Sequence, residues 1–77
     1  MSTIFEEVKT NKGWTLSITK INELIFKTRL DDNFGKLIEI KSFRADKGDQ
    51  MDLLADYINL FNDDPKKNLN SLRKIKA

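Results

Sequence analysis

Apolar and polar residues alternate along the stretch that begins at Trp14. Over residues 14–19 every second residue is apolar, and the residues between them carry hydroxyl groups. A period of two is typical of a strand with one buried face, so this stretch predicts a strand. The same period returns over residues 24–30 and 36–43, and the turn formers of residues 31–35 separate these two stretches. Short connections join antiparallel neighbours, so the pattern predicts a three-stranded meander over residues 14–43.

The alternation also assigns a face to each side chain of the predicted sheet. We expect an apolar inward face, made of Leu16, Ile18, Phe26, Leu30, Ile38 and Ile40. The outward face then carries basic, hydroxyl-bearing and some apolar side chains, namely Thr15, Ser17, Ile25, Lys27, Arg29, Lys41 and Phe43. This basic and aromatic face is the first candidate surface for binding.

The N-terminal residues carry signals for a helix. Thr3 and Glu6 have the spacing of a capping box, and the apolar residues that follow Thr3 at i, i+1 and i+4 would share one side of a short helix. We therefore predict a helix over residues 3–11, ended by Gly13. An edge strand, which Phe5 and Val8 would also suit, is the alternative.

Two further helices are predicted after the sheet. Asp49 is a favourable N-cap for a main helix over residues 50–62, and Asp64-Pro65 has the residue types preferred at the start of a short basic helix over residues 65–76. The apolar residues of the main helix form an arc wider than one sheet covers. A chain of 77 residues makes one domain over residues 1–77. The predicted fold is α+β, a three-stranded antiparallel sheet backed by helices, in the order α-β-β-β-α-α.

Composition removes several classes of chemistry. The chain has no cysteine and no histidine, which excludes disulfides, thiolate nucleophiles, cysteine zinc sites and the commonest general base. We expect no catalytic residues, no enzyme activity, no metal, no cofactor and no small-molecule substrate. No apolar run exceeds three residues, so we expect neither a membrane span nor a signal peptide. These features together predict a cytoplasmic protein.

Charge is distributed unevenly, although the net charge is only +2. Residues 31–64 carry four basic and nine acidic side chains, whereas residues 65–77 carry five basic side chains and no acidic ones. The ordinary interpretation is a solvated helix face followed by a solubilising tail. The alternative is that the basic tail contacts the acidic helix of its own chain or of another copy.

The leading hypothesis is a non-enzymatic module that binds single-stranded DNA or RNA. Cations would meet the phosphates, and an exposed phenylalanine would stack on a base. The candidate residues lie on the outward sheet face and in the basic tail: Lys27, Arg29, Lys41, Phe43, Lys66, Lys67, Arg73 and Lys74.

The alternative hypothesis is a small protein-binding module that forms a homodimer, of the kind found among phage- or plasmid-type inhibitors of host proteins. It is based on the wide apolar arc of the main helix and on the acidic ridge beside that arc. The candidate interface residues are Leu53, Tyr57, Leu60, Asp52 and Asp56.

Two short motifs resemble parts of known families. Gly13-Trp14, placed after a short helix and before a strand that ends in Phe26-Lys27, resembles the opening of HicA-type ribonuclease toxins, but the catalytic histidine of that family is absent. Phe5-Glu6-Glu7 and Lys12-Gly13-Trp14, followed by strands and an amphipathic helix, resemble bacterial relatives of the positive-cofactor coactivators. That second resemblance implies a dimer that binds single-stranded DNA. Each resemblance covers a few residues, and we assign the chain to neither family.

Overall fold

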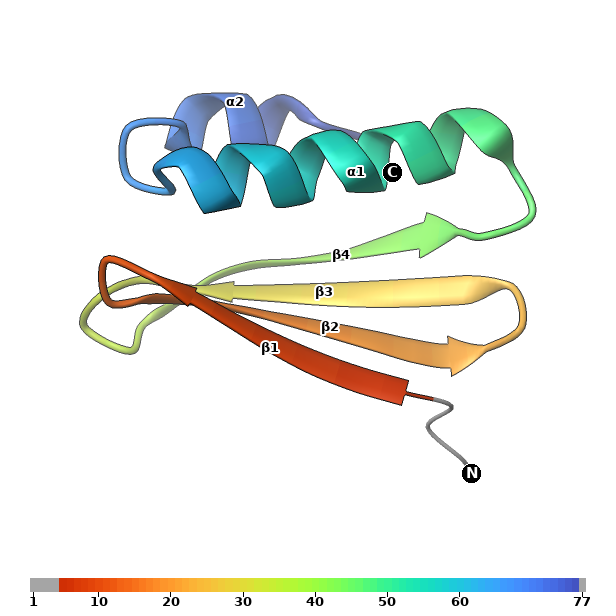
Figure 1. Cartoon of the computed structure of the whole chain (residues 1–77), viewed down its shortest axis with the longest axis horizontal. Coiled ribbons are helices and arrows are strands. Elements are labelled where there is room, and N and C mark those ends of the chain that lie inside the picture. The colour runs from red at the N-terminus through yellow and green to blue at the C-terminus, as the bar shows by residue number, and fades with distance from the viewer. Residues whose placement is uncertain (1–4, 77) are drawn as a thin grey trace.

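Four strands precede two helices along the chain. The computed structural model describes residues 5–76. The strands are β1 (Phe5–Asn11), β2 (Trp14–Asn22), β3 (Ile25–Asp31) and β4 (Leu37–Arg44), and the helices are α1 (Gly48–Asp63) and α2 (Leu69–Lys74). The strands form one antiparallel sheet in the order β1-β2-β3-β4 (Figure 1). The fold is therefore α+β in the order β-β-β-β-α-α.

The predicted helix at the N-terminus is wrong over its described part, and residues 3 and 4 lie outside the described residues. Residues 5–11 form β1, which pairs with β2 along its whole length, from Phe5 opposite Lys20 to Asn11 opposite Trp14. Lys12 (φ 53°) and Gly13 (φ 85°) both have positive φ and make a two-residue hairpin turn. Glycine at this position suits a hairpin as well as a helix C-cap, and pairing with β2 decides in favour of the hairpin.

The sheet therefore has four strands, not three. Its last strand is turned over relative to the prediction from Glu39 to Phe43, although Ile38 packs against the core as predicted. Phe43 lies opposite Phe26 and is fully buried, whereas Ile40 lies opposite Arg29 and is 48% exposed. The register shifts at Leu30/Asp31, beside the loop between β3 and β4. Because side chains alternate between faces, a shift of one residue exchanges the two faces of the strand.

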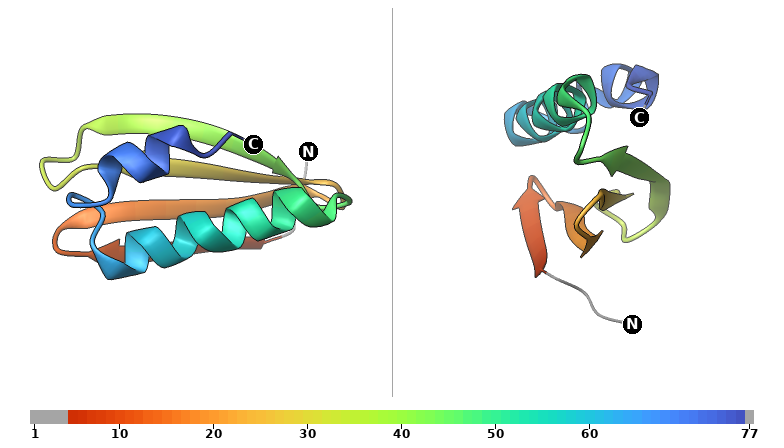
Figure 2. Two further views of the ribbon diagram at one scale, coloured as in Figure 1. Left: turned by 90° about the horizontal axis from the view of Figure 1, so that it is seen from above. Right: turned by 90° about the vertical axis from the view of Figure 1, so that its right-hand side faces the viewer.

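Both helices lie on the same face of the sheet, called here the covered face (Figures 1 and 2). The main helix begins at Gly48, two residues before the predicted start, and ends at Asp63. Lys47 takes the N-cap position predicted for Asp49, which lies instead in the first helical turn. The second helix is shorter than predicted, because residues 65–68 form turns and only Leu69–Lys74 are helical. The side-chain amide of Asn11 donates to the carbonyls of Phe61 and Asn62 at 2.9 and 3.0 Å, which ties the β1–β2 hairpin to the end of α1.

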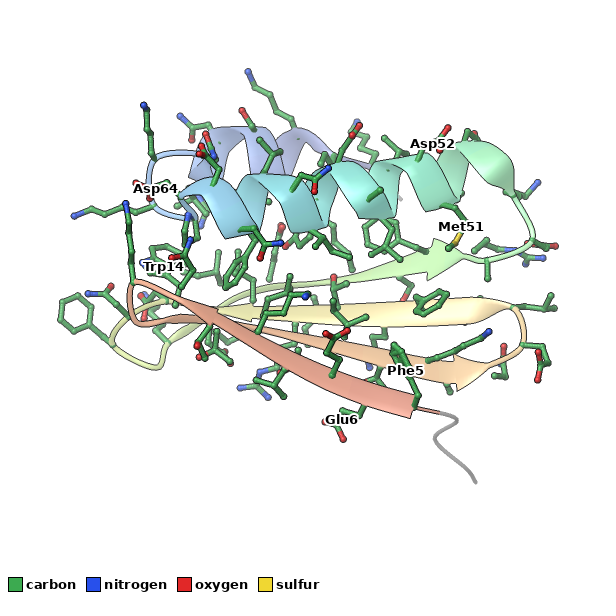
Figure 3. All side chains as sticks on the ribbon, viewed as in Figure 1. Phe5, Glu6, Trp14, Met51, Asp52 and Asp64 are labelled. Atoms are coloured by element: carbon green, nitrogen blue, oxygen red, sulfur yellow. The ribbon has the colours of Figure 1, made fainter. Side chains whose placement is uncertain are left out.

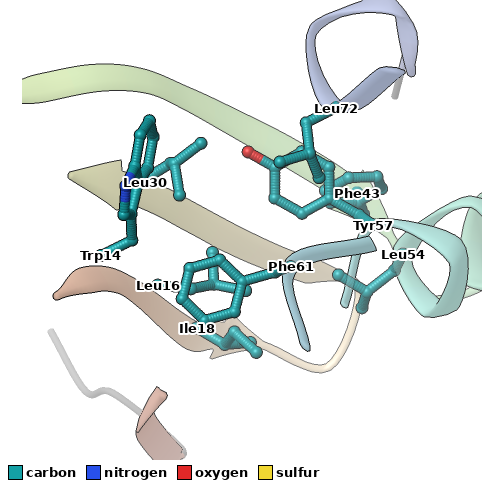
Figure 4. Close-up of a cluster of buried hydrophobic side chains, with 9 residues drawn as sticks. All are labelled: Trp14, Leu16, Ile18, Leu30, Phe43, Leu54, Tyr57, Phe61 and Leu72. Carbon is teal, nitrogen blue, oxygen red and sulfur yellow. The ribbon is translucent and has the colours of Figure 1, made fainter. Parts of the chain in front are cut away.

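The core lies between the covered face and the helices (Figure 4). Its nine buried apolar residues come from three strands and both helices: Trp14, Leu16, Ile18, Leu30, Phe43, Leu54, Tyr57, Phe61 and Leu72. The wide apolar arc of α1 thus has two partners within the chain, because the sheet takes one part of it and α2 packs beside it. No helix in the described part of the chain is long and apolar enough to cross a membrane.

Candidate nucleic-acid interface

The face of the sheet opposite the helices carries no other described element and is called here the open face. Cross-strand neighbours place Ser17 beside Arg29 and Thr19 beside Lys27, and on the other side of β3 they place Ser42 beside Lys27. Glu6 of β1 points to the same side, away from the helices (Figure 3). Lys27 of β3 is therefore flanked by hydroxyl groups on both sides, whereas Arg29 has a hydroxyl group beside it on β2 and the apolar Ile40 beside it on β4.

The open face carries a shallow depression. Antiparallel strands twist relative to one another, and the end-on view in Figure 2 shows that the sheet curls strongly between β1 and β4. The depression on the open face has a volume of about 610 Å³. Its lining comes from all four strands: Glu6, Ser17, Thr19, Ile21, Lys27, Thr28, Arg29, Asp31 and Ile40. A single extended chain fits such a depression better than a folded domain does.

Lys27 and Arg29 differ in how far neighbouring carboxylates neutralise them. Arg29 Nε donates to Asp31 Oδ1 at 3.2 Å, two residues along the same strand face, and the remaining guanidinium nitrogens make no hydrogen bond within residues 5–76. Lys27 is exposed and makes neither an ion pair nor a hydrogen bond with any described residue. The ammonium group of Lys27 is therefore the cation of this face most available to an anionic ligand.

A third cation stands at the end of β4. The Arg44 guanidinium donates twice to Asp46, at 3.1 and 2.9 Å. These hydrogen bonds raise the pKa of Arg44 and lower the pKa of the Asp46 carboxyl. Both groups stay charged at neutral pH, but the pair is mutually neutralised and adds less to the open face than Lys27 does.

Two of the predicted sheet residues lie on the wrong face for binding. Phe43 is fully buried, with its ring centroid 6.0 Å from that of Tyr57. Lys41 also points to the covered face, where its Nζ donates to the carbonyl of Ile75 at 2.7 Å and lies 3.4 Å from Glu39 Oε2. The expectation that Phe43 and Lys41 face outward is therefore wrong, for the same reason that β4 is turned over.

The predicted basic tail does not join Lys27 and Arg29. It lies in the helical layer, on the opposite side of the sheet (Figure 1). Asp64 Oδ1 accepts from the backbone N–H groups of Lys66 and Lys67, both at 3.1 Å, so this aspartate caps the turns before α2 as its position suggested. The four basic side chains predicted there are all exposed: Lys66, Lys67, Arg73 and Lys74.

Three of the five α1 residues predicted for the alternative protein interface are buried or half-buried against other residues of the same chain. Tyr57 is fully buried and donates its hydroxyl to Glu39 Oε1 at 2.9 Å. Burial, with the nearby Glu39 charge, raises the pKa of this phenol far above its usual value. Leu53 and Leu60 are half-buried and pack against the core. Asp52 and Asp56 remain exposed on the outer surface of α1.

Two exposed features escaped the sequence prediction. Ser42 and Arg44 belong to the open face, and the inverted register of β4 concealed them. Phe34 is 89% exposed in the loop between β3 and β4, where Asp32 Oδ1 accepts from the N–H of Phe34 and of Lys36. The Asp-Asn-x-Gly pattern of this loop signalled a turn, but it did not signal that the phenylalanine between Asn33 and Gly35 would point into solvent.

Comparison of the chain with protein-family models, with curated proteins and with solved structures finds no match. Within residues 5–76, no group of three or more acidic side chains is placed to hold a metal ion.

Proposed function

We propose that this protein binds single-stranded nucleic acid across the open face of its sheet. The observation that carries the proposal is an uncovered sheet face with a shallow depression, in which Lys27 and Arg29 lie beside the hydroxyl groups of Ser17, Thr19 and Ser42. Grooves that combine cations with a sheet surface are typical of proteins that follow a single strand.

The cations and hydroxyls of this face suit the sugar-phosphate backbone. Lys27 offers a point charge to one phosphate, and the free guanidinium nitrogens of Arg29 offer a planar set of donors to the next. The hydroxyls of Ser17, Thr19 and Ser42 can donate to phosphate oxygens or, in RNA, hydrogen-bond the ribose 2′-hydroxyl. No aromatic side chain of the described residues lines the depression. Contacts to the backbone alone give little base preference, so we expect binding that is nearly independent of sequence.

The direct test is a titration of fluorescent oligothymidylate and oligouridylate, followed by anisotropy, at salt concentrations from roughly 50 to 200 mM. We expect the affinity to fall with salt, with a logarithmic slope near −0.7 for each phosphate neutralised. The affinities for the two strands should differ little. Absence of binding at the lowest salt concentration would refute the proposal.

A pair of double variants separates the open face from charge in general. Lys27→Ala with Arg29→Ala removes two cations from the open face, whereas Lys66→Ala with Lys67→Ala removes two from the helical side. We expect the first to weaken binding and to make the salt slope shallower by about 0.7 for each phosphate that is no longer neutralised. The second should leave both the affinity and the slope nearly unchanged. An equally large decrease in affinity in the two variants would show that the binding does not depend on the open face.

A further inference from the structure

The first strand presents a free edge along its whole length. β1 is an outer strand of the sheet, and no described element pairs with its other side. Asn11 and Trp14 lie opposite each other at the two ends of the two-residue turn. In a hairpin with such a turn, the residues that flank the turn are a hydrogen-bonded pair. Because such pairs alternate along antiparallel strands, the backbone groups of Glu6, Val8 and Thr10 point away from β2. These groups are available to another strand.

The side chains of β1 have a pattern that is complementary to itself. Val8 is central and 57% exposed, and it lies between Glu7 and Lys9, whose side chains share the covered side of the strand. These two charges are exposed by 52% and 30% and lie 3.3 Å apart within one chain. If two copies of β1 run antiparallel with Val8 opposite Val8, each Glu7 lies opposite the Lys9 of the other copy.

That arrangement is the favoured register of the free edge. One copy of β1 can slide along the other only by an even number of residues, because only then do the outward-pointing backbone groups of the two strands meet. The register centred on Val8 pairs all seven residues of β1. A shift by two in one direction places Glu7 opposite Glu7, and a shift in the other direction places Lys9 opposite Lys9. Like charges directly opposite each other are unfavourable, so the charges select the central register.

The other outer strand has a similar sequence pattern but a different environment. Glu39 and Lys41 of β4 are also separated by one residue, yet Glu39 accepts from Tyr57 and Lys41 donates to the carbonyl of Ile75. Their side chains are only 19% and 13% exposed. Glu39 and Lys41 of β4 thus have hydrogen-bond partners in the helical layer, whereas Glu7 and Lys9 of β1 are exposed enough to pair with charges of a second copy.

We propose that a second copy of this chain docks on β1, with the two strands antiparallel and centred on Val8. The two four-stranded sheets then join into one continuous sheet. The two-fold axis of an antiparallel strand pair is perpendicular to the sheet, so both open faces lie on the same side. The proposal depends only on the β1 edge, and it stands or fails independently of nucleic-acid binding.

The first experiment measures the molar mass of the full chain by sedimentation equilibrium, at concentrations up to roughly 1 mM. We expect a reversible equilibrium between monomer and dimer. Lys9→Glu and Glu7→Lys should each weaken self-association by at least about tenfold, because like charges replace opposite ones across the interface. A chain that stays monomeric at the highest concentration would overturn the proposal.

Mixing the two single variants is the decisive arm. In the proposed register a strand with two acidic residues is complementary to a strand with two basic ones, so Lys9→Glu and Glu7→Lys should associate with each other more tightly than either associates with itself. Like charges within each variant strand are still present in the mixture, so this rescue cannot come from within one chain. A mixture that stays monomeric would refute the register.

A second pair of variants tests which edge is used. Val8→Pro removes an N–H that points to the free edge and makes no bond to β2, so the fold should survive and dimerisation should be lost. Ile40→Pro is the matched change on β4. The N–H of Ala45 donates to Leu24, and the alternation from that bond places the N–H of Ile40 on the outer edge of β4. Dimerisation that survives Val8→Pro but is lost in Ile40→Pro would move the interface to β4 and overturn the proposal.

Discussion

The two faces of one sheet differ sharply, although the same strands supply both. On the covered face Leu16, Leu30 and Phe43 are fully buried under the helices. Their neighbours along the chain, Ser17 and Arg29 among them, face solvent. A period of two lets one strand serve a core and a binding surface at once, but only while its register keeps each residue on its own face.

The charged groups of the two faces also differ in their hydrogen-bond partners. Glu39 and Lys41 on the covered face each have a hydrogen-bond partner in the helical layer, the Tyr57 hydroxyl and the Ile75 carbonyl. Lys27 on the open face has no partner among the described residues. A charge that is partly removed from water needs such partners, whereas a solvated charge does not and stays available to a ligand.

The largest expected difference in stability between the two faces is between two alanine substitutions in β4. Phe43→Ala leaves a cavity in the core and should lower the free energy of unfolding by roughly 3–5 kcal/mol, enough to unfold a domain of this size. Ile40→Ala on the open face should cost less than about 1 kcal/mol. Urea denaturation followed by the fluorescence of Trp14, which is 5% exposed in the fold, measures both. Equal losses of stability would contradict the observed orientation of β4.

A smaller change in the free energy of unfolding is expected at Thr28 on the covered face. Thr28 is 1% exposed, and its hydroxyl has no hydrogen-bond partner among the described residues. Thr28→Val keeps the shape and removes this buried polar group, so we expect the free energy of unfolding to rise by about 1 kcal/mol. Thr19→Val on the open face is the control and should change it by less than about 0.5 kcal/mol. A clear loss of stability in Thr28→Val would show that the hydroxyl is hydrogen-bonded.

The smallest expected change in stability is at Asp64, where the hairpin of β1 and β2 meets the helices. Lys12 Nζ donates to Asp64 Oδ2 at 2.9 Å, and this bond, with the N–H of Lys67, lowers the pKa of the Asp64 carboxyl below its ordinary value. A lowered carboxyl pKa adds stability above the unfolded value, and that contribution disappears as the pH falls through the folded value. Asp64→Asn should therefore be less stable than the parent at neutral pH.

The same comparison at acidic pH completes the test. From about pH 5 down to about pH 2 the difference between Asp64→Asn and the parent should shrink. Denaturation midpoints at several pH values measure this change. Asp56→Asn is the control, because Asp56 is exposed and makes no hydrogen bond with a described residue. A difference that stays constant with pH would contradict the role of Asp64.

Part of the candidate site was predictable from the sequence. The alternation from Trp14 to Thr19 correctly gave β2 and its faces, and Lys27 and Arg29 lie on the predicted side of β3. Phe43 and Lys41 were assigned to the wrong face, because the period of β4 alone does not reveal a register shift at Leu30/Asp31. The basic tail was recognised as basic, but its position on the far side of the sheet depends on how α2 packs.

The sequence by itself determined the local elements with a strong period: β2, β3, the presence of β4, and the main helix. The spacing of apolar residues is a local property, so it can be read from neighbouring residues. Three features were decided only by the tertiary structure. Pairing with β2 makes residues 5–11 a strand, the register with β3 selects the buried face of β4, and packing of α2 covers the second side of α1. Each depends on contacts between residues far apart in the chain, which satisfy backbone groups and bury apolar area that no local pattern specifies.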